Sequence, residues 1–423
     1  MEEEKSTGHA VVLSRLSSVV PATPSTGSQI AHLLTDSDLS MKLQYVRAVY
    51  YFEKRSVENF CDGKWKEAFL DPLLDYRPVA ERLNLAPDGR LYVKCNDAGV
   101  RIFEAFSDSN LKDWEDLKDC CLEPELSRTD QNLGSDFSSV TPLVIVQFTR
   151  FKCGGVAIGV SWSHVLGDAF SASVFMKEWG ESYRRNRSKP CPATCTEHRA
   201  EKSRWAPNNQ FHKDLWVNTQ QENTMMETAS FRLSETMVYY LMSQAQDSKS
   251  LKPVTPFVAI SAFVWKSILK AHPERRYHNA LICTNVSKYK KASSRLGNIN
   301  QILTQVQISN ENGSIELSNL DLCKIAQLIQ NGGQRTSMNG DGAALVYGSD
   351  LTFLNLEHLP CYDLVLEQEG PVHVSYTVEP VGDNGMVIII PSSEGGKSRV
   401  VKVSLYKDEL VTLKEEFIQF SIV

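Results

Sequence analysis

Residues 156–183 constrain the fold more than any other part of the sequence. Every second residue from Val156 to Trp162 is large and apolar, and the residues between them are small. This period of two is typical of a β-strand with one face packed on bulky neighbours. A short turn follows, and from Asp168 to Tyr183 large apolar residues recur at helical spacing. We therefore predict a buried strand, a tight turn and a helix with Asp168 as its N-cap.

His164 lies at the end of this strand and has the same parity as Trp162, so we expect its imidazole to point inward. A histidine at a strand end, just before a helix N-terminus, is well placed to act as a general base at a cleft. It would take a proton from an acceptor hydroxyl or amine that attacks an acyl carbonyl. A hydrogen-bonded core histidine is the alternative, since a His-x-x-x-Asp spacing arises easily by chance in a chain with nine histidines.

The remaining pattern indicates a mixed α/β protein in two halves. Strands or helices are predicted at 11–20, 143–148, 156–164, 229–233, 257–271, 372–378, 386–391, 399–405 and 407–420. Between the halves, residues 184–213 are polar, basic and interrupted by prolines, which favours a solvated linker over a phosphate-binding patch. We predict an N-terminal domain at 1–185, a crossover linker at 186–215 and a C-terminal domain at 216–423.

Composition excludes several classes of function. The chain has 423 residues, 42% of them hydrophobic, and a net charge of -6, so no basic surface predicts binding to nucleic acid or to an anionic membrane. Its ten cysteines lack the spacing of a metal site, and we expect reduced thiols in the cytosol. The acidic N-terminus has no apolar signal segment. The run Met386–Ile390 is far shorter than the ~20 residues that span a bilayer, so no transmembrane segment is predicted.

Residues 161–171, SWSHVLGDAFS, resemble the HxxxD segment of the plant BAHD acyl-CoA-dependent acyltransferases. The resemblance covers nearly the whole chain. Further segments similar to that family are LLDYRPVAERL at 73–83, KCNDAGVRIFEA at 94–105, the helix at 257–271 and Gly297-Asn298.

This resemblance implies an α/β fold of two domains related to chloramphenicol acetyltransferase. Each domain would be a mixed sheet flanked by helices, with a solvent channel between the domains. In the family the motif histidine is the general base and the motif aspartate is structural, which assigns these roles to His164 and Asp168. The family uses acyl-CoA as a donor substrate and needs no metal or resident cofactor. The resemblance also implies a monomer, and it leaves the substrate-binding residues unknown.

The second family signature, DFGWG, is lost. Its frame remains as Tyr362-Asp363 and the strand after Pro371, but the motif itself has become Val365, Leu366, Glu367, Gln368 and Glu369. Replacing two glycines by glutamates removes backbone freedom and adds two charges. In the family the DFGWG aspartate pairs with an arginine before the "YFGN" element. Residues 281–294 contain no arginine, only Lys288, Lys290 and Lys291. Both ends of that ion pair are therefore absent.

An HxxxD motif combined with a lost DFGWG is similar to the Eceriferum/Glossy-type wax branch of the family. The segments that resemble this branch are RLSSVVPA at 15–22, MKLQYVRAVY at 41–50, RFKCGG at 150–155, GDAFSAS at 167–173 and VGDNG at 381–385. Membership implies a protein that promotes elongation of very-long-chain fatty acids for cuticular wax. Its partner would be the fatty-acid elongase condensing enzyme, and it would reside in the cytosol and at the cytosolic face of the endoplasmic reticulum.

Two alternatives remain open on the sequence. The chain could be a working O- or N-acyltransferase with His164 as its base, because the DFGWG motif lies away from the chemistry. It could also be a lipid-binding protein that holds a long acyl chain or acyl-CoA, with His164 kept only for packing.

Overall fold

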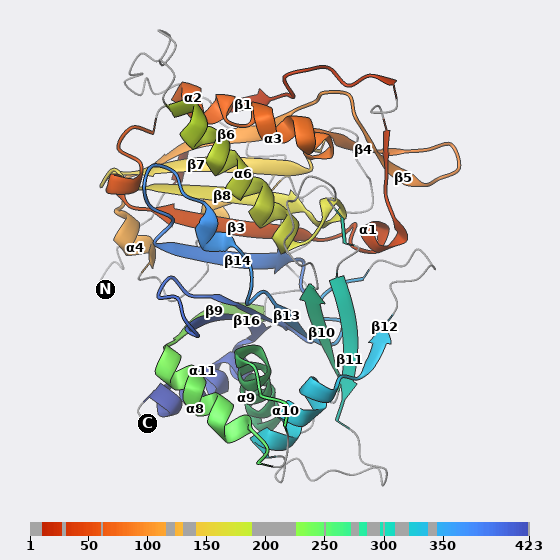
Figure 1. Cartoon of the computed structure of the whole chain (residues 1–423), viewed down its shortest axis with the longest axis vertical. Helices are drawn as coiled ribbons and strands as arrows, with labels where there is room; N and C mark the ends of the chain where they lie inside the picture. Colours follow the sequence, from red (N-terminus) through yellow and green to blue (C-terminus); the bar gives the residue numbers. More distant parts are fainter. Residues whose placement is uncertain are drawn as a thin grey trace, which may run out of the picture. The chain divides into compact units, whose positions relative to one another are not determined.

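A computed structural model of the chain describes residues 11–27, 31–60, 62–115, 123–129, 141–187, 226–248, 251–271, 279–285, 297–298, 301–308, 321–336 and 345–421. These residues fall into two compact units. Figure 1 draws the chain in colours that follow the sequence. The first unit holds the described residues up to 187, together with Gly297 and Pro360–Thr377. The second unit holds the others.

The first unit is built on a six-stranded mixed sheet with the strand order β1-β6-β7-β8-β3-β14. Its strands are β1 (Val11–Val19), β3 (Tyr45–Phe52), β6 (Val100–Ser107), β7 (Val144–Phe151), β8 (Val156–Ser163) and β14 (His373–Glu379). β6 and β7 run parallel, whereas β8 is antiparallel to both of its neighbours, β7 and β3. In this central position every residue of β8 is buried.

Helix α6 (Ala169–Arg187) crosses one face of this sheet (Figure 1). Aromatic rings from the sheet and the helix pack together beneath it: Trp162 lies 5.6 Å from Phe175, and Phe148 lies 5.7 Å from Trp179, between ring centroids. Short helices α2 (Asp62–Glu67) and α3 (Leu70–Asp75) pack against α6. Large buried rings of this kind supply much of a core's hydrophobic free energy.

The opposite face of the sheet carries a smaller apolar cluster and the short helices α4 (Leu111–Glu115) and α5 (Glu123–Leu126). A Cβ atom on Gly159 would lie 1.8 Å from the carbonyl oxygen of Leu126, so only glycine lets α5 approach β8 this closely. The buried Arg47 donates to the carbonyl oxygen of Pro124 at 3.1 Å and fixes the same helix.

A separate three-stranded antiparallel sheet, β2-β5-β4, completes the first unit. Its strands are β2 (Ala31–Leu33), β4 (Arg82–Leu85) and β5 (Leu91–Lys94). The helix α1 (Asp36–Ser40) follows β2 directly.

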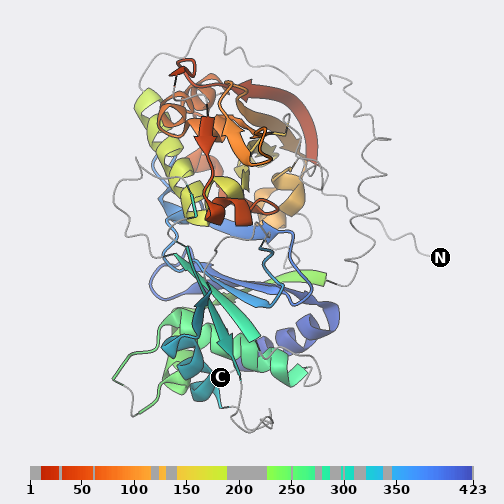
Figure 2. The same cartoon turned by 90° about the vertical axis from the view of Figure 1, so that its right-hand side faces the viewer.

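The second unit is a seven-stranded mixed sheet with the order β12-β11-β10-β13-β15-β16-β9. Its strands are β9 (Met226–Leu233), β10 (Asn279–Asn285), β11 (Gln301–Gln307), β12 (Gln334–Thr336), β13 (Leu351–Asn355), β15 (Met386–Pro391) and β16 (Arg399–Tyr406). Four helices lie along one face (Figure 2). They are α8 (Glu235–Ala245), α9 (Pro256–Ala271), α10 (Leu322–Asn331) and α11 (Lys407–Ser421). Apolar residues of α9, including Trp265 and Ile268, form the centre of the core.

The structural division differs from the predicted domain boundaries in two places. Residues 360–377 were predicted to belong to the C-terminal domain, but they lie in the first unit because β14 joins the six-stranded sheet beside β3. Gly297 belongs to the first unit for a related reason, a β-bridge to Gly167. The predicted linker begins inside α6, and its residues from 188 onward lie outside the described part of the chain, as do Lys288, Lys290 and Lys291.

Candidate functional site

The turn from His164 to Asp168 is the first candidate site. The strand β8 ends at Ser163, and His164 opens a one-turn 3-10 helix, η5 (His164–Leu166), rather than ending the strand as predicted. The main-chain N–H of His164 donates to the carbonyl oxygen of Gln44 at 2.9 Å, which ties the residue to the segment before β3. The His164 side chain is 1% exposed, in agreement with the inward orientation expected from its parity.

Two features fix the shape of this turn. Gly167 has a φ of 134°, a left-handed conformation that favours glycine, and a Cβ atom there would lie 2.3 Å from Ser171 Oγ. The buried Trp162 donates its indole N–H to the carbonyl oxygen of Gly167 at 3.0 Å. The large residue that fills the core under α6 therefore also holds the turn that carries His164.

Asp168 lies at the start of α6 and is 5% exposed. One of its carboxylate oxygens, Oδ1, accepts the main-chain N–H groups of Phe170 at 3.1 Å and Ser171 at 3.2 Å. This is the N-cap arrangement predicted from the sequence, and a negative charge at a helix N-terminus is favourable. Asp168 therefore stabilises the start of α6, and this role does not depend on a substrate.

Asp38 is a neighbour of this turn that the sequence analysis did not select. It forms a capping box with Thr35: its carboxylate accepts the Thr35 main-chain N–H at 2.9 Å, and its own N–H donates to Thr35 Oγ1 at 3.2 Å. Helix α1 packs against η5, and a Cβ atom on Gly297 would lie 3.3 Å from Asp38 Oδ1. The Thr-x-x-Asp spacing at the start of α1 was the available signal.

The loop that replaces DFGWG is ordered and packed against the first unit. Leu364 and Leu366 are 1% and 0% exposed. Leu364 occupies a notch on α6 where a Cβ atom on Gly180 would lie 2.6 Å from its Cδ1. Asp363, just before the loop, pairs with Lys177 of α6 at 2.8 Å.

Both glutamates of this loop bind the segment that follows β3. Glu367 Oε1 accepts the main-chain N–H of Asn59 at 2.7 Å. Glu369 Oε2 lies 2.9 Å from Arg55 Nε and accepts Ser56 Oγ at 3.3 Å. The charges that replaced glycine are thus used to attach the loop to residues 55–59.

A pair of buried tyrosine hydroxyl groups connects the neighbouring strands β3 and β14. The hydroxyl groups of Tyr50 on β3 and Tyr376 on β14 are 2.5 Å apart, and both side chains are buried. Burial raises the pKa of both phenols, and burial also raises the pKa of the nearby Cys361 thiol to about 12. All three groups are therefore neutral near pH 7, and Cys361 is not an activated nucleophile.

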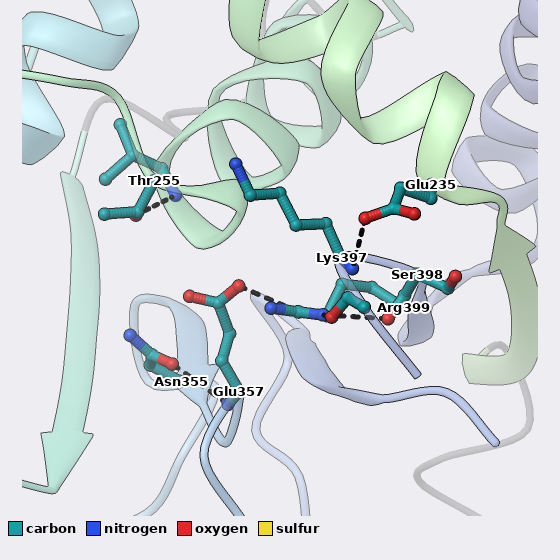
Figure 3. A network of polar contacts seen from close by, with 9 residues as sticks. Glu235, Thr255, Asn355, Glu357, Lys397, Ser398 and Arg399 are labelled. Carbon is teal, nitrogen blue, oxygen red and sulfur yellow. Dashed lines mark hydrogen bonds and ion pairs between the residues drawn. The ribbon is translucent and has the colours of Figure 1, made fainter. Parts of the chain in front are cut away.

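The second unit contains a separate polar network (Figure 3). Arg399 Nε donates to Glu357 Oε1 at 2.9 Å, and both side chains are less than 10% exposed. Arg399 also donates to the carbonyl oxygens of Gly396 and Ser398, while Glu235 of α8 accepts the main-chain N–H of Lys397 at 3.1 Å. The network closes the turn between β15 and β16, and no residue in it was predicted as a site.

No group of three or more His, Cys, Asp or Glu side chains suited to a metal ion occurs within the described residues. Among the helices described, none combines the length and apolar character needed to cross a bilayer.

Comparison of the sequence with known families and proteins gives three findings. Residues 10–420 match the model of a family described as the Transferase family. The chain is 32% identical to Protein ECERIFERUM 2 of Arabidopsis thaliana over 97% of this chain and 98% of that protein. It is 28% identical to Protein ECERIFERUM 26-like of the same plant, over 95% and 94% of the two chains.

Among solved structures, the crystal structure of vinorine synthase superposes with a TM-score of 0.69 at 16% identity, covering 95% of this chain and 96% of that one. An identity this low bears on the fold alone. The predicted α/β class with two chloramphenicol-acetyltransferase-like domains is confirmed.

Proposed function

Because the chain belongs to the Transferase family, that of the BAHD acyltransferases, and within it to the ECERIFERUM branch, we propose that it promotes very-long-chain fatty acid elongation for cuticular wax. It would act as an accessory to the condensing enzyme of the endoplasmic reticulum, as a monomer in the cytosol and at the cytosolic face of that membrane. Very-long-chain acyl groups, free or as acyl-CoA, would be its ligands, and it would need no resident cofactor.

The observation that carries this proposal is the loop at 364–370. Its DFGWG sequence is gone, yet Leu366 is buried and Glu367 and Glu369 bind residues 55–59. The loop is therefore a rebuilt part of the first unit. An ordered loop with a new sequence, on an otherwise unchanged fold, fits a protein whose role has shifted from catalysis to the support of a partner.

A second function is favoured by the His164–Asp168 turn. Its histidine, its glycine and its N-cap are all present, and the Trp162 hydrogen bond holds them in one geometry. Under this alternative, His164 Nε2 or Nδ1 would remove the proton from an acceptor hydroxyl or amine. The acceptor would then attack the acyl-CoA thioester, and CoA would leave as the thiol.

The experiment that separates the two functions measures fatty-acid chain lengths in a heterologous host that carries a plant condensing enzyme. Four strains are compared: the condensing enzyme alone, and the enzyme with the wild type, with His164→Ala or with His358→Ala. His358 is an exposed histidine of the second unit and serves as the matched control. We expect all three versions to lengthen the chains equally, because the proposed role does not use the imidazole of His164.

Loss of lengthening in His164→Ala alone would contradict the accessory role without catalysis, provided that the variant unfolds with the wild-type midpoint. A purified-protein assay then tests the alternative. Release of CoA thiol from an acyl-CoA with a panel of alcohols, abolished by His164→Ala, would establish acyl transfer. Native mass spectrometry of the purified protein would reveal a retained acyl chain if the protein instead stores lipid.

A further inference from the structure

A second buried carboxylate, that of Asp38, lies close to the backbone around the His164 turn. Asp38 is 4% exposed, and its Oδ2 accepts both the main-chain N–H and the hydroxyl of Thr35, at 2.9 and 2.6 Å. Its other carboxylate oxygen, Oδ1, is the atom nearest to a Cβ atom placed on Gly297, at 3.3 Å. The two oxygens of Asp38 therefore have different roles: one caps α1, and the other faces the main chain of Gly297.

Gly297 in turn lies directly against the turn that carries His164. Gly297 and Gly167 form a parallel β-bridge, and a Cβ atom on Gly167 would lie 3.0 Å from the main-chain nitrogen of Gly297. Both glycines have a positive φ, 135° and 134°. Because neither residue carries a side chain, the carboxylate of Asp38, the main chain at Gly297 and the turn at Gly167 can approach one another this closely.

A hydrogen bond inside the turn links Gly167 to His164. The main-chain N–H of Gly167 donates to the carbonyl oxygen of His164 at 3.0 Å and closes η5. The main-chain N–H of His164 donates to Gln44, just before β3, so the backbone of the histidine is held on both sides. The direction of the imidazole therefore depends on where Gly167 lies.

Helix α1 is anchored firmly enough to support this arrangement. The residues that flank the helix, Leu34 and Met41, are 2% and 0% exposed. Arg90 donates to the carbonyl oxygen of Leu34 at 3.2 Å and pairs with Asp36 at 3.3 Å, and α1 packs against η5. The carboxylate of Asp38 is therefore presented by an element whose own position is fixed.

We propose that Asp38 is a positioning residue for His164, acting through Gly297 and Gly167. Its carboxylate sets the position of Gly297, the β-bridge passes this on to Gly167, and the hydrogen bond within η5 passes it on to His164. The effect on a reaction rests on the acyl-transfer alternative described under the proposed function. The effect on the position of the imidazole is independent of which function the protein performs.

The first test is an NMR spectrum of the full chain with isotope-labelled histidine, in which the imidazole resonances of His164 are identified by their loss in His164→Ala. We expect Asp38→Asn, which keeps the size of the side chain and removes its charge, to shift these resonances. Asp36→Asn is the matched control in the same helix, with a side chain that is 66% exposed, and should leave them unchanged. Thr35→Ala weakens the cap of α1 and should lower the midpoint of urea unfolding without shifting His164.

A double-variant cycle tests the route through Gly297. Gly297→Ala adds a methyl group 3.3 Å from Asp38 Oδ1 at a φ of 135°, so it should also shift the His164 resonances. If the two residues act along one route, Asp38→Asn/Gly297→Ala should shift the resonances by less than the sum of the single variants. Gly395→Ala, at a positive φ with open space around its Cβ position, should leave them unchanged. Additive shifts would overturn the route through Gly297.

Turnover separates positioning from substrate binding. If the purified protein releases CoA thiol from an acyl-CoA with an alcohol acceptor, Asp38→Asn should lower kcat by about ten- to a hundredfold and leave the KM for acyl-CoA unchanged, because the base is displaced and the donor contacts are kept. Asp36→Asn should retain the wild-type kcat and KM.

The proposal is overturned if the imidazole resonances of His164 are the same in Asp38→Asn and in the wild type, or if Thr35→Ala and Asp36→Asn shift them to the same extent. This outcome is distinct from failure of the proposed function. A protein that releases no CoA thiol refutes the acyl-transfer alternative, and the spectra still decide the role of Asp38. Unchanged spectra in a protein that does release CoA thiol refute only the role of Asp38.

Discussion

The His164–Asp168 turn and the 364–370 loop belong to the same unit but are stabilised in opposite ways. In the turn the stabilising contacts are buried and polar: the indole N–H of Trp162 binds the Gly167 carbonyl, and Asp168 caps α6. In the loop the polar contacts are exposed, since Arg55 and Glu369 have side-chain exposures of 64% and 46%, and the buried contacts are made by leucines. Buried polar contacts tolerate few substitutions, whereas the exposed residues of a loop can be substituted if its buried apolar residues are kept.

This difference separates the presence of a motif from its use in catalysis. Gly167, Trp162 and Asp168 each stabilise the backbone of the turn, so this sequence would be kept for folding alone. The DFGWG sequence is not required for the folding of this loop, because two glutamates and two leucines hold the loop in its place. A preserved HxxxD motif is therefore weak support for chemistry.

The largest effect is expected for Gly167→Ala in the turn. The added methyl group would overlap Ser171 Oγ at 2.3 Å, at a φ of 134° that other residues rarely adopt. Strain and overlap together should lower the free energy of unfolding by about 3 to 4 kcal/mol, measured by urea denaturation.

The matched control for that variant is Gly395→Ala. Gly395 also has a positive φ, 74°, but nothing lies within 4 Å of a Cβ atom there. It should lose only about 1 kcal/mol, from backbone strain. Equal losses in the two variants would show that the turn is not tightly packed.

Sequence patterns predicted the turn better than the loop for a physical reason. The strand β8 and the helix α6 have strong periods, and Asp168 is a residue type typical of N-caps, so local sequence specifies that geometry. The contacts of Glu367 and Glu369 join residues more than 300 positions apart in the chain, and no local period encodes them. The same holds for the approach of Asp38 to Gly297, and for the pairing of β14 with β3 that places residues 360–377 in the first unit.

A slightly smaller effect is expected for Leu366→Ala in the loop. Leu366 is 0% exposed, so truncation removes buried apolar surface and leaves a cavity. The free energy of unfolding should fall by about 2 to 3 kcal/mol in urea denaturation. Val365→Ala, at a partly buried neighbour, is the control and should lose clearly less. A Leu366→Ala variant as stable as the wild type would show that burial of Leu366 does not stabilise the loop.

Trp162→Phe should cost about 2 kcal/mol, because it keeps most of the ring but leaves the buried Gly167 carbonyl without its donor. Trp65→Phe offers a matched control, since Trp65 is equally buried and sits in the same aromatic core. If the hydrogen bond matters for the turn, Trp162→Phe should also alter the imidazole resonances of His164 in an NMR spectrum, and Trp65→Phe should leave them unchanged. Identical spectra for the two variants would contradict that link.

The smallest effect is expected for the double variant Glu367→Gln/Glu369→Gln. Both carboxylates act at the surface, where an ion pair such as Glu369–Arg55 contributes about 0 to 1 kcal/mol. The loop should therefore stay closed. Cys361, at its base, reports on closure: burial raises the pKa of its thiol to about 12, so alkylation at pH 8 should be slow compared with the exposed Cys153. Rapid alkylation of Cys361 in the double variant, with wild-type rates at Cys153, would show that the glutamates and not the leucines hold the loop.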